Sequence, residues 1–361
     1  MKIKVVESYS DFLEAREIWE EALSRSDHTI FSTWEWLSTW WKYWGNGRRL
    51  LILIAEHDGK VLGIAPLMRS TYKMMGLQIA KIEFIGTPNS DYHDFLLTDK
   101  KQECIDLFVN YLKNLDTAWD CLDLVDFPEN AQYLPLLSKS LKKNLTQFHD
   151  CPFMGLPKTY ELLINGLSRN QRKNIYRSGR RLKEMFEVEF VDYSQLESFP
   201  EGMRFLFDLH QKRWQSRGLP GIFADRKVRD FNFEVSKKLF QRKWLSLFLL
   251  RLSGKPVSAA YGFKYRSKFC EYATGFEPSY NKYNVGNLLR AHMINQFIQE
   301  GLTEFDFMRG AEEYKERWNT SIRWNRRAII TRKGFPSAFR NWLCNQYTYQ
   351  VRKAKHFLRL C

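Results

Sequence analysis

Ionisable and hydrogen-bonding side chains are concentrated in residues 309–318, directly after a segment that reads as a β-strand over residues 303–308. The stretch is Arg-Gly-Ala-Glu-Glu-Tyr-Lys-Glu-Arg-Trp, and ligands of α/β proteins sit at the carboxyl ends of strands. We predict that Asp306 and Glu313 accept a proton there and that Tyr314 returns one. The alternative for Asp306 is a structural ion pair with Arg309.

A second feature is the turn over residues 278–286, which leads into a helix that we expect to begin near Asn287. Asn and Gly both tolerate left-handed backbone angles, so this turn can point its amides outward. A helix N-terminus attracts anions, and each contact contributes roughly 0.3–1 kcal/mol. We therefore predict a pyrophosphate group as the ligand of this turn. The alternative is that the turn only connects the strand to the helix and contains a glycine for its backbone geometry. The predicted cofactor contacts are Asn284, Val285, Gly286, Asn287 and Leu288.

The elements around these residues occur twice in the same order, which indicates an internal repeat. Each copy is a hairpin, a third strand, a helix and a fourth strand. The hairpins cover residues 50–68 and 244–264, and the remaining elements cover residues 81–125 and 271–308. Only the second copy has a glycine at its helix entry, so we assign the cofactor to that copy. We expect an N-terminal domain over 1–155, a C-terminal domain over 156–335 and a basic tail over 336–361.

Composition limits the class of protein. A length of 361 residues suggests two domains, and the formal net charge of +15 favours acidic partners. The six cysteines form no C-x-x-C pair or metal-ligand spacing, so we expect free buried thiols and no metal. The start has no apolar signal-peptide core, and no apolar run reaches the roughly 18 residues of a transmembrane helix, so we expect a cytoplasmic protein.

The carboxy-terminal half resembles the GNAT acyltransferase superfamily. Asn281-x-x-Asn284-x-Gly286 falls on the pyrophosphate loop of that superfamily. The run Phe305-Asp-Phe-Met-Arg-Gly-Ala-Glu-Glu-Tyr-Lys315 is similar to a block of cellulose-biosynthesis (CelD-type) acetyltransferases, and to their tandem relatives, the FemABX-type aminoacyltransferases. The resemblance also takes in residues 31–37 and 90–96. It implies an α/β (α+β) fold of two tandem GNAT-like units, each a mixed, mostly antiparallel sheet flanked by helices.

The resemblance also implies an activity. We expect an N-acyltransferase that moves an acyl group, acetyl first of all, from acyl-CoA to an amine by direct attack in a ternary complex. The acceptor class it implies is an amino sugar or amino acid of envelope or exopolysaccharide assembly. The alternatives are a Fem-like transferase that uses aminoacyl-tRNA and a non-catalytic protein that binds anions or lipid. The candidate substrate contacts are Asp91, Tyr92, Asp94, His210, Trp214, Arg309 and Lys315.

Two further basic segments have no assigned role. Residues 167–183 contain seven basic side chains and no acid, and Ser168 with Gln171 predicts a capped helix. One interpretation of these residues is a solvent-exposed helix face with no partner. The alternative is a binding surface for an acidic partner, such as an acyl carrier protein or tRNA. The tail past Lys333 is also basic and either docks on the protein or contacts anionic lipid. Oligomeric state is not readable from these patterns.

Overall fold

The computed structural model describes residues 1–74, 76–115, 119–195, 197–331 and 342, and it divides the chain into two compact units. The first unit contains residues 1–149 and the chain from Trp324 onward that is described, and the second contains residues 150–323. The chain crosses between them inside β7 (Thr146–Gly155) and again inside β13 (Ser321–Thr331). The predicted boundaries at 155 and 335 therefore differ from the observed ones. The predicted tail, residues 336–361, lies outside the described residues apart from Trp342.

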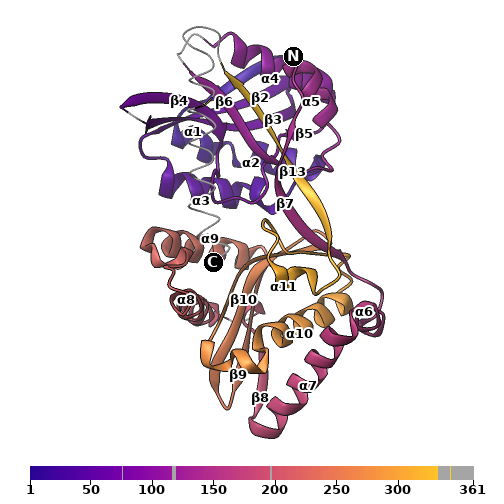
Figure 1. Cartoon of the computed structure of the whole chain (residues 1–361). Coiled ribbons are helices and arrows are strands. Elements are labelled where there is room, and N and C mark those ends of the chain that lie inside the picture. The colour runs from indigo at the N-terminus through magenta and orange to yellow at the C-terminus, as the bar shows by residue number, and fades with distance from the viewer. Residues whose placement is uncertain (75, 116–118, 196, 332–341, 343–361) are drawn as a thin grey trace. The chain divides into compact units, whose positions relative to one another are not determined.

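The first unit is a mixed sheet in the strand order β1-β2-β3-β4-β6-β13, in which only β4 and β6 pair in parallel. Helices α4 and α5 pack on one face in a core rich in leucine and phenylalanine. Trp36 and Trp40 of α3 are fully buried. Its elements are β1 (Lys2–Val6), α1 (Tyr9–Glu14), α2 (Arg16–Arg25), α3 (Trp34–Trp44), β2 (Arg48–His57), β3 (Lys60–Met74), β4 (Leu77–Phe84), β5 (Leu96–Leu97), α4 (Lys101–Lys113), β6 (Cys121–Phe127) and α5 (Leu134–Leu141) (Figure 1).

The second unit repeats that topology, with the strand order β8-β9-β10-β11-β12-β7 and a single parallel pair, β11 with β12. The predicted duplication and the mixed, mostly antiparallel sheets are thus confirmed. Its elements are α6 (Tyr160–Gly166), α7 (Arg169–Met185), β8 (Val188–Asp192), α8 (Phe199–Gln215), α9 (Arg226–Gln241), β9 (Leu245–Leu252), β10 (Lys255–Tyr265), β11 (Lys268–Phe276), α10 (Val285–Gln299), β12 (Glu304–Asp306) and α11 (Glu313–Glu316) (Figure 1).

The last strand of each sheet comes from the other half of the chain. β7 follows the elements of the first unit but pairs with β12 through Phe153–Gly155. β13 follows the elements of the second unit but pairs with β6 through Arg326–Thr331. Each sheet is therefore completed by an exchanged strand.

Both faces of the second sheet are covered by helices, because its strands are apolar on both sides. On one face the ring of Phe248 lies 5.9 Å from that of Phe297 on α10. On the other face the hydroxyl groups of Ser236 on α9 and Tyr261 on β10 lie 2.9 Å apart. Alternate residues of each strand thus contact α10 on one side and α8 with α9 on the other.

Candidate active site

The second unit contains a cavity of about 580 Å³ that is bounded by β11, the start of α10, the end of α8 and residues 311–317. The volume is in the usual range of small-molecule sites. Its polar and charged lining residues are Arg213, Arg217, Ser258, Glu271, Thr274, Asn281, Asn284, Asn287, Arg290, Glu312, Glu313, Tyr314 and Arg317.

The cavity lies beside the part of β11 that has no partner in β12, because β12 ends at Asp306. β11 pairs with β12 only through Lys268–Cys270, yet β11 continues to Phe276. Residues past this pairing, such as Glu271 and Thr274, line the cavity. α8 closes the site from the side because Gly275 lets it approach β11: a Cβ there would lie 2.3 Å from the backbone nitrogen of His210.

One end of the cavity is the turn before α10. Asn284 is left-handed with φ of 60°, and its side-chain oxygen accepts a hydrogen bond from the side-chain Nδ2 of Asn287 at 2.8 Å. Gly286, the second residue of the helix, lines the cavity, and a Cβ there would meet no protein atom within 4 Å. The first turn of α10 is therefore open towards the cavity, which fits a phosphate group at the helix start.

A buried ion pair crosses the middle of the cavity. Arg290 of α10 donates from Nε and Nη2 to the two carboxylate oxygens of Glu271, at 2.8 and 2.9 Å. Burial lowers the pKa of Arg290, but Glu271 outweighs it and the pKa lies above its ordinary value. The same guanidinium lies 4.7 Å from the ring centroid of Tyr314. Sequence reasoning missed this pair, because no local pattern links two residues that are 19 positions apart.

The end of α8 contributes positive charge. Arg213 donates to the Thr274 hydroxyl at 2.8 Å, and within the described residues neither Arg213 nor Arg217 has an ion-pair partner. Burial lowers the pKa of Arg213. Trp214 lines the cavity, and its indole N–H donates to Nε2 of His210 at 2.8 Å. Burial, with help from Arg213, lowers the pKa of His210 to about 3, so its imidazole is neutral and serves to position Trp214.

The segment after β12 is organised by Lys315. Its ammonium donates to the carbonyls of Met308, Arg309 and Gly310 at 3.3, 3.1 and 2.8 Å, and it pairs with Glu312 at 2.6 Å. Lys315 is buried and absent from the cavity lining, so the structure does not support its predicted contact with substrate. Arg309 is likewise not among the lining residues.

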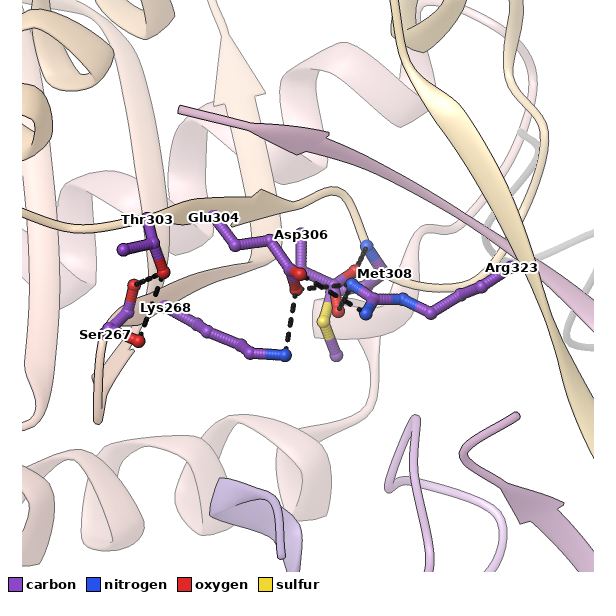
Figure 2. Close-up of polar contacts among 7 residues, drawn as sticks. All are labelled: Ser267, Lys268, Thr303, Glu304, Asp306, Met308 and Arg323. Carbon is purple, nitrogen blue, oxygen red and sulfur yellow. Dashed lines mark hydrogen bonds and ion pairs between the residues drawn. The ribbon is translucent and has the colours of Figure 1, made fainter. Parts of the chain in front are cut away.

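Two of the predicted catalytic residues, Glu313 and Tyr314, line the cavity, whereas Asp306 does not. Figure 2 shows Asp306 beside Arg323, whose Nη2 donates to Oδ2 at 3.0 Å, while Oδ1 accepts from the Met308 amide at 2.8 Å. The carboxylate is therefore structural, with Arg323 in place of the expected neighbour. Glu313 is exposed at the rim and pairs with Arg317 at 2.8 Å. Burial raises the pKa of Tyr314.

The remaining predicted residues lie away from the cavity lining. Val285 is buried in the core, and Leu288 packs towards α7. Asp91, Tyr92 and Asp94 belong to the first unit, where all three side chains are buried. The Tyr133 hydroxyl donates to Oδ1 of Asp94.

Within the described parts of the chain, no helix combines the length and apolar character needed to cross a lipid bilayer. The same residues contain no group of three or more His, Cys, Asp and Glu side chains placed to hold a metal ion. The four described cysteines, Cys104, Cys121, Cys151 and Cys270, are buried, and none of them is in a disulfide bond.

Comparison with known proteins matches residues 169–316 to the family described as the acetyltransferase (GNAT) domain. No curated protein sequence matches the chain. Among solved structures, FemX superimposes with a TM-score of 0.63 at 13% identity, covering 97% of this chain and 99% of FemX. A conserved protein of unknown function from Bacteroides thetaiotaomicron gives 0.56 at 10% identity, over 91% and 100% of the two chains. These similarities show a shared fold.

Proposed function

We propose that this chain, whose residues 169–316 form a GNAT-type acyltransferase domain, transfers an acyl group from a coenzyme A thioester to an amine. The observation that carries the proposal is the cavity beside β11, past its pairing with β12, which joins the open start of α10 to Tyr314.

The cavity suits a long donor with phosphates at one end. The open first turn of α10 at Gly286 would hold the phosphate groups, and the cations Arg213 and Arg217 would add positive charge. On its β12 side, β11 has no described strand pairing past Cys270, so its backbone amides there can bond an amide-containing arm. The reactive end of the donor then lies near Tyr314.

The chemistry needs little from the protein beyond placement. When bound, the donor supplies an activated acyl carbon and a thiolate leaving group. The amine nitrogen forms the new C–N bond as the C–S bond breaks. Glu313 takes the proton that the amine loses, and Tyr314, kept protonated by its raised pKa, holds a proton for the departing sulfur. Proximity alone contributes roughly 7–11 kcal/mol to such a transfer.

The acceptor class rests on the resemblance to cellulose-biosynthesis acetyltransferases, and we propose an amino sugar or amino acid used in envelope or exopolysaccharide assembly. A second candidate activity, transfer of an aminoacyl group from tRNA, is favoured by the exposed arginines of α7. Loss of product after RNase treatment would identify that activity.

The test is a donor screen across acyl-CoAs with a panel of amines, read by mass spectrometry, together with calorimetry against acetyl-CoA. The proposal expects acylated amine and free thiol in equal amounts, and a measurable heat of binding. If millimolar acetyl-CoA gives no heat and no donor gives product, the chain is a non-catalytic binding protein and the proposal fails.

A further inference from the structure

Helix α7 presents an almost uniformly positive face. Its inner side carries Ile175 and Leu182, which are buried in the core of the second unit. The opposite side, at helical spacing, carries exposed cations, which we call the basic face: Arg169, Lys173, Arg177, Arg180, Arg181 and Lys183. Its one acid, Glu184, pairs with Arg180 at 3.6 Å, and such exposed pairs contribute little. A 17-residue helix is about 25 Å long, so the charge extends well beyond a single contact.

The basic face borders the phosphate end of the cavity. The Arg181 guanidinium lies 5.1 Å from the ring centroid of Tyr283, the residue directly before Asn284. The ring of Phe186, the C-cap residue of α7, lies 6.0 Å from the same tyrosine. Arg181 and Phe186 therefore lie beside the turn that leads into the open start of α10.

A groove of about 550 Å³ runs between α7 and α10. Its floor contains Leu288 and the stacked rings of Phe190 and His292, whose centroids are 4.1 Å apart. Arg180 and Lys183 line its edge. The surface next to the cavity thus combines a line of cations with an apolar depression, as interfaces for charged proteins do.

We propose that the basic face and this groove dock an acidic acyl carrier protein, so that the donor is a protein-bound phosphopantetheine thioester. This inference rests on the proposed function, because the same arm enters the same cavity and the carrier thiol is the leaving group. Coenzyme A and a carrier protein share that arm and differ only beyond its phosphate. Six exposed cations along about 21 Å exceed what one nucleotide needs, and they complement an acidic helix.

Nucleic acid fits the same surface less well. Proteins that bind single strands interleave cations with aromatic side chains on which bases stack. On the outer side of α7 only Tyr176, 62% exposed, could serve as such a platform. The observations therefore favour an acidic protein over RNA.

The experiment compares kcat/KM for purified acyl carrier protein loaded with acetyl and for acetyl-CoA, with one amine acceptor at low and at physiological salt. The test variant is Lys173→Glu with Arg177→Glu, two exposed residues on the basic face that do not line the cavity. The matched control is Arg204→Glu with Lys237→Glu, exposed cations of α8 and α9. Circular dichroism melts establish that both variants fold.

We expect the wild type to prefer the loaded carrier, with a kcat/KM that falls as salt rises. The α7 variant should lose at least tenfold with the carrier and less than twofold with acetyl-CoA, and the control should lose neither. If the α7 variant and the wild type turn over the loaded carrier equally well, the inference is overturned. Turnover of acetyl-CoA in the same experiment would still support the proposed function. Loss of RNA binding without any carrier effect would also overturn it. No turnover with either donor would sink both proposals.

Discussion

Replacing Gly286 with valine should impair phosphate binding without destabilising the fold. A Cβ at this position meets no protein atom within 4 Å, and the residue lies in the first turn of α10. Glycine is about 1 kcal/mol less favourable than alanine inside a helix, so the substitution should leave stability unchanged or raise it slightly. The new methyl groups would instead occupy the cavity in front of the helix amides.

The cost to binding follows from the hydrogen bond that the valine side chain would block. A hydrogen bond from a backbone amide to a charged group contributes roughly 1.5–3 kcal/mol. Without one such bond the donor KM rises by roughly 10- to 150-fold, because each 1.4 kcal/mol is a factor of about ten. Initial-rate kinetics and calorimetry with acetyl-CoA measure the effect, and urea unfolding measures stability.

Gly166→Val provides the matched control. Gly166 ends α6, a Cβ there also meets no atom within 4 Å, and the residue does not line the cavity. Its donor KM should stay within twofold of the wild type. If Gly286→Val folds normally and also keeps the wild-type KM, the donor phosphate does not rest on the start of α10 and the reasoning is refuted.

Three further experiments test separate parts of the structure. Arg290→Met leaves the Glu271 carboxylate buried without its partner and should lower the free energy of unfolding by about 3–5 kcal/mol, measured by urea denaturation. Adding Glu271→Gln should recover part of this loss, and a double variant that recovers none of it would contradict the pairing. Tyr314→Phe should lower kcat by about 10²–10⁴-fold with little change in donor KM, and an unchanged kcat in the pH–rate profile would remove Tyr314 as the proton donor. Burial raises the pKa of Asp94 to about 8, whereas an unfolded aspartate titrates near 3.9, so folding takes up a proton between these values. Wild-type stability should therefore fall as pH rises from about 4 to 8, and Asp94→Asn should lack that slope in urea midpoints taken across the range.

Much of the fold was predictable because its signals are local. The two hairpins, the third strands and the helix before residue 301 follow from turn residues and from hydrophobic spacing. The strand exchange was not predictable, because neither β7 nor β13 carries a local mark of which strand it pairs with. The domain boundary at 155 was therefore drawn after a strand that the structure divides between both units.

The site was predictable in outline only. The turn before α10 and the segment after β12 were found from residue types, and both line the cavity. Sequence cannot say which ionisable group is already engaged: Lys315 is held by three backbone carbonyls and Asp306 by Arg323. Conversely, Glu271 and Arg213 reach the cavity only through the packing of α10 and α8 on β11, which no linear spacing reveals.

The exchanged strands β7 and β13 make the two halves of the chain mutually dependent. After a cut at residue 155, the first fragment would keep β7 without β12, and the second would keep β13 without β6. Each sheet would also lose its last strand, and the open sheet edge invites aggregation. Neither half of the chain contains all the strands of its own sheet, so we expect neither half to fold when it is expressed alone. Unfolding of either half of the chain should withdraw the strand that it contributes to the other sheet. We therefore expect both sheets to unfold in one cooperative transition.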